Sequence, residues 1–196
     1  MTTRMAIFAS GSGSNFQAIV DACHKRQLDA APVLLVCDKP DAYVVERAEA
    51  ANIPSFTFVP KSYQNKTEFE QDILLQLNEH NIDFIVLAGY MRLIGPTLLQ
   101  AYKGRIVNIH PSLLPAFPGL DAVGQALDYG VKLTGVTIHF VDEGMDTGPI
   151  IAQEALEIKE DDTKESLAKK IHQIEHSFYP KTLQQLFTVK GEAAIR

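Results

Sequence analysis

Three polar residues in the second half of the chain have side chains suited to acyl and proton transfer. Asn108 and His110 alternate along a strand-like run, so both leave the same face, roughly 6.6 Å apart. Asp146 lies in a loop between two glycines. An amide can stabilise a developing oxyanion, an imidazole can move a proton near neutral pH, and a carboxylate can orient that imidazole or relay the proton. We expect a direct transfer reaction, since no nucleophile with a suitable partner accompanies them.

Each of these residues also has a purely structural interpretation. A single histidine on an apolar strand is most often a core residue whose hydrogen bonds are satisfied. The run from Pro111 to Gly119, however, has three prolines in nine residues and must be a shaped loop directly after His110. The three polar residues together with this loop favour a catalytic site.

A glycine- and serine-rich loop near the N-terminus is a second candidate site. The backbone N–H groups of Gly13, Ser14 and Asn15 could converge on a phosphate at the start of a helix. A dinucleotide fingerprint needs a third glycine where this chain has Phe16, so a single phosphate is favoured. An oxidoreductase stays open as an alternative, because Asp38 lies 22 positions beyond Phe16 (38 − 16), near the place of a ribose-binding acid. The structural alternative is a tight turn with a Ser or Asn cap and no ligand.

Short apolar runs alternate with amphipathic stretches, which is typical of βαβ units and a parallel sheet. In the first half we expect strands over Met5–Ala9, Val33–Val36, Ser55–Val59 and Phe84–Ala88, and helices from Asn15, over Tyr43–Ala51 and from a capping box at Thr67 and Glu70. In the second half we expect strands over Ile106–His110, Gly135–Val141 (with Thr137 and His139 exposed) and Ile150–Ala152, and helices over Asp121–Tyr129 and from Asp162. Pro180 should kink or restart the last helix.

The composition fits one folded domain and excludes several classes of protein. The chain of 196 residues is 46% hydrophobic and 21% charged, as globular proteins are, so we expect no membrane segment. The net charge of −6 argues against nucleic acid as a partner, because no basic field exists to bind it. Cys23 and Cys37 fit neither a disulfide scaffold nor a zinc site, and no signal peptide is evident, so we expect a cytoplasmic protein with reduced thiols.

Four motifs, in order along the chain, resemble the phosphoribosylglycinamide formyltransferase family of purine biosynthesis. They are GSGSN at 11–15, LAGYMR at 87–92, NIHPSLLP at 108–115 and DEGMDTGPII at 142–151. The third motif alone would mark only the wider formyltransferase superfamily, whereas the glycine loop points to a ribonucleotide phosphate. The resemblance covers nearly the whole chain.

The resemblance implies an α/β fold with a Rossmann-like, doubly wound, mostly parallel sheet. It implies a single domain over 1–196, with phosphate binding in about 1–100 and catalysis and folate binding in about 101–196. The formyl donor would be 10-formyltetrahydrofolate, the acceptor would be the amine of glycinamide ribonucleotide, and no metal would take part. The protein would be a monomer or homodimer that binds small molecules and neither nucleic acid nor membrane.

The resemblance also assigns roles to single residues. It makes Asn108, His110 and Asp146 catalytic, and it places the substrate phosphate and ribose at Gly13, Ser14, Asn15 and Glu175. It places the folate at Lys66, Met91, Arg92, Leu93, Val141, Asp142, Glu143, Gly144 and Met145. One departure is His172, which stands where some members carry a glutamine near the phosphate and would make substrate affinity more dependent on pH.

Three alternatives share part of this pattern. A formyltetrahydrofolate deformylase would use the same three catalytic residues with water as acceptor. In such enzymes, however, a core like this one follows an N-terminal regulatory domain. A methionyl-tRNA formyltransferase would need a further C-terminal domain and a basic surface. A non-catalytic nucleotide-binding module would keep the glycine loop without needing Asn108, His110 and Asp146.

Overall fold

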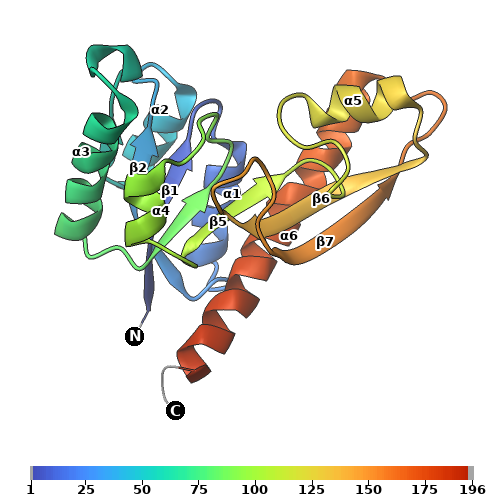
Figure 1. Cartoon of the computed structure of the whole chain (residues 1–196). Helices are drawn as coiled ribbons and strands as arrows, with labels where there is room; N and C mark the ends of the chain where they lie inside the picture. The colour runs from blue at the N-terminus through green and yellow to red at the C-terminus, as the bar shows by residue number, and fades with distance from the viewer. Residues whose placement is uncertain (1, 194–196) are drawn as a thin grey trace.

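The computed structural model describes residues 2–193, and the side chains of residues 2–188. A seven-stranded sheet has the order β3-β2-β1-β4-β5-β6-β7, in which the first five strands are parallel and β6 and β7 are antiparallel (Figure 1). The strands are β1 (Thr3–Ala9), β2 (Ala30–Cys37), β3 (Ser55–Thr57), β4 (Phe84–Leu87), β5 (Ile106–His110), β6 (Leu133–Phe140) and β7 (Ile150–Glu157). The helices are α1 (Ser14–His24), α2 (Tyr43–Ala50), α3 (Lys66–Glu79), α4 (Pro96–Ala101), α5 (Ala122–Tyr129) and α6 (Lys164–Ala193), with a 3-10 turn at Pro60–Ser62.

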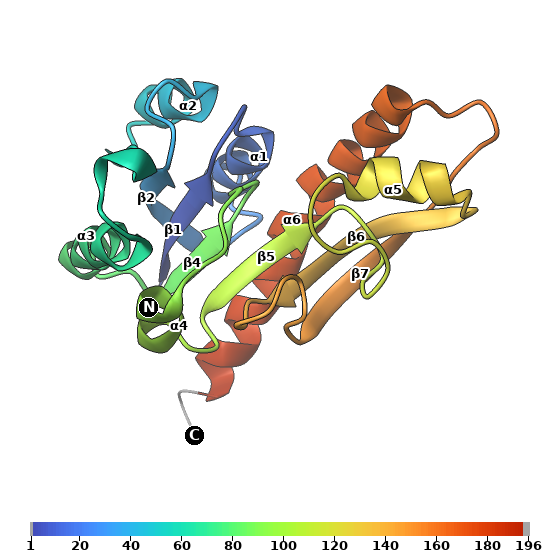
Figure 2. The same ribbon diagram turned by 45° about the horizontal axis from the view of Figure 1, so that its top comes forward.

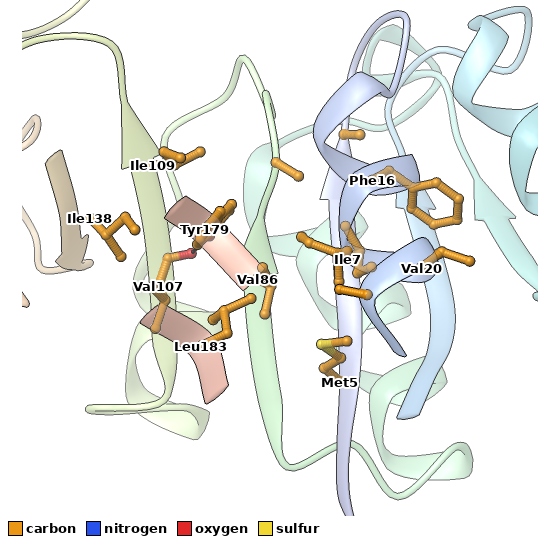
Figure 3. Close-up of a cluster of buried hydrophobic side chains, with 14 of the residues drawn as sticks. Met5, Ile7, Phe16, Val20, Val86, Val107, Ile109, Ile138, Tyr179 and Leu183 are labelled. Atoms are coloured by element: carbon orange, nitrogen blue, oxygen red, sulfur yellow. Dashed lines mark hydrogen bonds between the residues drawn. The ribbon is translucent and has the colours of Figure 1, made fainter. Parts of the chain in front are cut away.

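Helices cover both faces of the sheet, so the chain is doubly wound. Alternate strand residues supply two buried clusters: Met5 and Ile7 belong to the one that includes α1 and α6, whereas Ala6 and Phe8 belong to the one that includes α3 and α4. Figure 2 shows α6 crossing behind β5 and β6, and Figure 3 shows Tyr179 of this helix among the strand side chains of the first cluster. The predicted Rossmann-like, doubly wound and mostly parallel sheet is confirmed.

The strand order creates a crevice between the carboxyl ends of β1 and β4. The chain leaves β1 toward β2 and β3, then returns to place β4 on the other side of β1. Ligands of doubly wound sheets bind at such a switch point. Here the glycine loop follows β1 and the segment after β4 faces it, joined by a 3.0 Å hydrogen bond from the Ser10 N–H to the Gly89 carbonyl.

The predicted capping box at Thr67 and Glu70 is wrong. The side chain of Asn65 caps α3 by accepting a hydrogen bond from the Glu68 N–H, so the helix begins at Lys66. Asn65 has an extended backbone and lies where the N-cap geometry requires it, and this leaves Glu70 free for a contact elsewhere. The predicted third strand is also shorter than expected, because it ends at Thr57 before the 3-10 turn.

Pro180 does not restart the last helix. Helix α6 continues through it over 30 residues. Tyr179 and Leu183, one on each side of the proline, are both fully buried against the sheet, so packing holds the two halves of the helix together. Thr137 and His139 are also buried rather than exposed, because loops cover their face of β6. Among the described residues, no helix has the length and apolar character needed to cross a membrane.

Candidate active site

Strand β5 presents Asn108 and His110 on a part of the sheet that loops cover. Val107 and Ile109 point into the core beneath α6, so the alternation turns Asn108 and His110 to the opposite face. The antiparallel partner β6 places His139 directly opposite Asn108. Three polar side chains therefore share one face at the carboxyl end of β5.

The structure brings Asn108, His110 and Asp146 together, as the sequence predicts. The Asp146 carboxylate lies between the other two: its Oδ2 is 3.3 Å from His110 Nδ1, and its Oδ1 is 3.4 Å from Asn108 Nδ2. On its other side, Nε2 of His110 is 2.8 Å from the Phe117 carbonyl oxygen. A carbonyl and a carboxylate are both acceptors, so only the imidazolium form of His110 can donate to both. The site thus places a histidine that can act as an acid in its protonated form next to an amide donor.

Asp146 is held by its backbone as well as by its neighbours. Its φ of 57° is left-handed, and the Gly119 N–H donates to Oδ2 at 2.8 Å. Two residues later, a Cβ on Gly148 would lie 1.9 Å from the Phe140 carbonyl, so only glycine lets the loop close at this point. Burial raises the pKa of Asp146, but contacts with His139, Gly119 and His110 outweigh this and hold the pKa below its ordinary value. The carboxylate is therefore ionised opposite the imidazole.

His139 is a site residue that the sequence reasoning missed. Its side chain is only 2% exposed, with Nε2 lying 3.1 Å from Asn108 Nδ2 and Nδ1 lying 2.8 Å from the Phe140 carbonyl. A carbonyl can only accept, so Nδ1 donates to Phe140, and Nε2 is left facing both the Asn108 amide and Asp146 Oδ1, the latter at 3.6 Å. The alternation of β6 gave a signal for His139, but only the register with β5 places it beside the catalytic candidates.

A cavity of about 520 Å³ joins these residues to the glycine loop. Its walls come from the loop after β1, the segment after β4, the end of β5, the loop after β6 and one side of α6. The predicted site residues that line it, besides the three catalytic candidates, are Gly13, Ser14, Asn15, Met91, Arg92, Leu93, Val141, Asp142, Gly144, Met145 and Glu175. Lys66 and Glu143 are not part of this lining; Lys66 instead donates from Nζ to the Leu93 carbonyl at 3.0 Å, behind the wall.

The glycine loop leaves the start of α1 open. Gly13 is the N-cap residue with a φ of 72°, and no side chain caps the helix, in contrast to the Ser or Asn cap of the structural alternative. A Cβ on Gly13 would lie 2.5 Å from Val44, so the loop requires glycine here. The first N–H groups of α1 therefore face the cavity without a side-chain partner, as an anion site needs.

Asn15 and Glu175 form a buried pair beside this loop. Nδ2 of Asn15 donates to Glu175 Oε2 at 2.9 Å, whereas the buried Oδ1 of Asn15 has no hydrogen-bond partner. Burial raises the pKa of Glu175, although the Asn15 hydrogen bond and His172 lower it in part. An acceptor without a partner next to a carboxyl group fits a ligand that brings hydroxyl or amine donors. His172 lines the cavity, and its ring is parallel to that of His176, with centroids 6.3 Å apart.

Comparisons with known proteins identify the family of this chain. The sequence model of a family described as "Formyl transferase" matches residues 3–183. The chain belongs to the formyl transferase family. It is 62% identical over 193 residues to phosphoribosylglycinamide formyltransferase of Bacillus subtilis (strain 168), covering 97% of this chain and 99% of the relative. It is also 41% identical over 181 residues to the human trifunctional purine biosynthetic protein adenosine-3, covering 92% of this chain and 18% of that longer protein.

Solved structures give the same result for the formyl transferase fold. The phosphoribosylglycinamide formyltransferase of Bacillus halodurans has a TM-score of 0.92 at 60% identity, covering 94% of this chain and 95% of that chain. Glycinamide ribonucleotide transformylase 1 of Geobacillus kaustophilus has a TM-score of 0.93 at 60% identity, covering 95% and 99%. The resemblance stated from the four motifs is confirmed.

The dinucleotide alternative is not supported in this formyl transferase. Asp38, the candidate ribose-binding acid, is already used on both carboxylate oxygens, by Ser10 Oγ at 2.5 Å and by Arg92 Nε at 2.8 Å. Within the part of the chain that the structure describes, no three His, Cys, Asp or Glu side chains are grouped to hold a metal ion.

Proposed function

We propose that this chain transfers the formyl group of 10-formyltetrahydrofolate to the amine of glycinamide ribonucleotide, giving formylglycinamide ribonucleotide and tetrahydrofolate. The observation that carries the proposal is one continuous cavity, with an open helix N-terminus at one end and Asn108, His110 and Asp146 in its wall. The relatives named as phosphoribosylglycinamide formyltransferase support it.

The acceptor would bind at the glycine loop. Its phosphate would lie against the N–H groups of Gly13, Ser14 and Asn15, where the helix dipole favours an anion even though the whole chain is acidic. Glu175 and the unpartnered Oδ1 of Asn15 would accept hydrogen bonds from the ribose. His172 on the same wall would contribute to phosphate affinity.

The folate would bind on the other side of the cavity. The segment after β4 supplies Met91, Arg92 and Leu93, of which the methionine and leucine are more than half exposed and offer apolar surface to a ring system. Val141 and the loop after it, with Gly144 and Met145, line the cavity opposite. Arg92 would be the nearest cation for the carboxylates of the folate tail.

The three catalytic candidates would act on the formyl carbon between these two ligands. The amine nitrogen of the acceptor forms a bond to that carbon, and the carbonyl oxygen gains negative charge, which Asn108 Nδ2 and the imidazolium of His110 would stabilise. The carbon–nitrogen bond to the folate then breaks, and the folate nitrogen takes a proton while the attacking amine loses one. Asp146, ionised beside His110, would hold the imidazole charged and relay this proton.

The hydrogen-bond donors of the site have internal acceptors in this structure. Asn108 faces His139 and Asp146, and His110 faces Asp146 and the Phe117 carbonyl. The oxygen of the formyl group would take the place of one of these acceptors as the oxyanion develops, so the donors are held close to their working positions without the substrate.

Absorbance of the folate tests the proposal directly. Purified protein is mixed with 10-formyltetrahydrofolate, with and without glycinamide ribonucleotide, and the loss of the formyl group is followed. We expect turnover only when the ribonucleotide is present. Turnover without it would indicate a deformylase, and no turnover in either reaction would leave a nucleotide-binding module.

A further inference from the structure

The wall that faces the folate, Met91–Ile94, is a segment without helix or strand. Gly89, whose φ is 79°, lies two residues before it, and Gly95, the residue before α4, follows it. A segment of this kind has no ladder of backbone hydrogen bonds, so contacts from outside must fix its shape. Two buried carboxylates, Asp38 and Glu70, supply such contacts, and neither one lines the cavity.

Asp38 holds the first part of the wall. Its carboxylate, with a side chain 3% exposed, accepts from Arg92 Nε at 2.8 Å through Oδ2 and from the Ser10 hydroxyl at 2.5 Å through Oδ1. The same Ser10 hydroxyl oxygen accepts from the Met91 N–H at 2.9 Å. Asp38 therefore fixes a side chain and, through Ser10, a backbone amide of two adjacent wall residues.

Glu70 holds the other end of the wall. It is 2% exposed, and its Oε1 accepts from the Gly95 N–H at 2.5 Å. Four residues earlier on the same helix, Lys66 donates from Nζ to the Leu93 carbonyl at 3.0 Å. Two residues one turn apart on α3 thus bind the backbone at Leu93 and at Gly95. The packing is close, because a Cβ on Gly95 would lie 2.7 Å from the Glu70 carboxylate and 2.7 Å from the Lys66 side chain.

We propose that Asp38 and Glu70 are positioning residues that hold the wall Met91–Ile94 in the shape that binds the formyl donor, without touching the donor themselves. This inference rests on the proposed function, since it concerns the folate side of the same cavity. Burial raises the pKa of Glu70, and the hydrogen bonds and Lys66 around it only partly oppose this. An apolar residue at this position would leave the buried Gly95 N–H without its acceptor.

The Asp38 contact predicts a selective loss of donor affinity. In Asp38→Asn the amide can still accept from Ser10, but its N–H₂ group meets Arg92, so the charged hydrogen bond is lost. We expect the dissociation constant of a folate analogue, measured by calorimetry without ribonucleotide, to rise about tenfold, since a hydrogen bond between charged groups contributes on that order. The KM for glycinamide ribonucleotide should stay within about twofold of the wild-type value, a difference of roughly 0.4 kcal/mol.

The chain offers a matched control in Asp162. Its side chain is also 3% exposed and pairs with a lysine, Lys170, at 2.7 Å, but it lies outside the cavity. Asp162→Asn should lower the melting temperature without changing the dissociation constant of the analogue. If Asp38→Asn behaves in the same way, with lower stability and unchanged donor binding, Asp38 has only a structural role and the inference is overturned.

A double-mutant cycle tests whether Asp38 acts through Arg92. In an Arg92→Gln background, Asp38→Asn should cause much less than its tenfold effect, because the partner is already gone. Equal effects in both backgrounds would contradict the positioning role.

The Glu70 contact has its own pair of variants. Glu70→Gln keeps an oxygen for the Gly95 N–H and should bind the analogue nearly as the wild type does, whereas Glu70→Ala should weaken it about tenfold. If Glu70→Ala does not fold, the Asp38 variants alone decide the inference. Failure of the proposed function is a separate result, because it would show as a wild-type protein without formyl transfer.

Discussion

Replacing Asp146 by asparagine tests the charge arrangement of the site. The substitution keeps the size of the side chain and one oxygen for the Gly119 N–H, but it presents either a neutral oxygen or an N–H₂ group to His110 Nδ1. Two unit charges 3.3 Å apart attract by about 5 kcal/mol at an effective dielectric constant near 20. Asp146 is 14% exposed, and solvent reduces this energy to roughly 3–5 kcal/mol.

This energy sets the size of the expected loss. If the imidazolium is needed only as the oxyanion develops, Asp146→Asn lowers kcat by about 10²–10⁴, at 1.36 kcal/mol for each factor of ten. In the proposed arrangement the phosphate and the folate ring are bound by other parts of the cavity, so both KM values should change little. His110→Ala should lose a similar factor, and the double variant should lose hardly more than the worse single one, because residues that act as a unit are not additive.

The assay is formyl transfer followed by folate absorbance at saturating concentrations of both substrates. Circular dichroism of each variant shows that it is folded, and Asp162→Asn serves as the control for loss of an ion-paired carboxylate outside the cavity. A variant of Asp146 or His110 that retains more than about a third of the wild-type turnover would refute the reasoning, since that corresponds to less than 1 kcal/mol.

Three further predictions concern the surroundings of the site. Glu175→Gln should unfold at a higher temperature than the wild type at pH 8 and at a similar temperature near pH 4. Folding raises the pKa of the Glu175 carboxyl group. This group therefore contributes stability at a pH below its ordinary pKa of 4.5, and the contribution is lost as the pH rises through the raised pKa. Melting curves of both proteins across this range check it, and parallel curves would contradict it. Tyr179→Phe should lower the free energy of unfolding by about 1–3 kcal/mol, because the buried hydroxyl contacts the carbonyls of Leu87 and Val107, at 3.0 and 3.1 Å. Urea unfolding measures this change, and an unchanged midpoint would count against it. Gly13→Ala should raise the KM for the ribonucleotide about tenfold or more while donor binding stays unchanged, because the new Cβ meets Val44; equal weakening of both ligands would show that the loop is not specific to the acceptor.

The fold and the grouping of the three catalytic candidates could be predicted because the signals for both are local in the sequence. Alternation along a strand of five residues puts Asn108 and His110 on one face whatever lies next to it. Asp146 could be found because it is the one carboxylate with a glycine two residues away on either side in that loop. These signals are contained in a few consecutive residues.

The supporting contacts could not be predicted in this way, because they join segments that are far apart in the sequence. His139 contacts Asn108 across an antiparallel pair, 31 positions away, and Asp38 contacts Arg92 across 54 positions. Asp38 even gave a misleading signal, since a ribose-binding acid would occupy a similar position. Its actual partners, Ser10 and Arg92, depend on the strand order, which brings the ends of β1, β2 and β4 together.

The misassigned capping box shows how local and tertiary demands compete for one carboxylate. A glutamate three residues after a threonine is a good local signal for a helix start. In the folded chain Asn65 takes the capping role, and Glu70 reaches across to the Gly95 N–H instead. Buried carboxyl groups with raised pKa values at Glu70 and Glu175 lower the stability of the fold at neutral pH; Glu175 lines the cavity, and Glu70 holds the segment that forms one of its walls. Departures of this kind from the rules of local structure are expected where a chain binds a ligand, and here they lie beside the proposed donor side and the proposed acceptor side of one cavity.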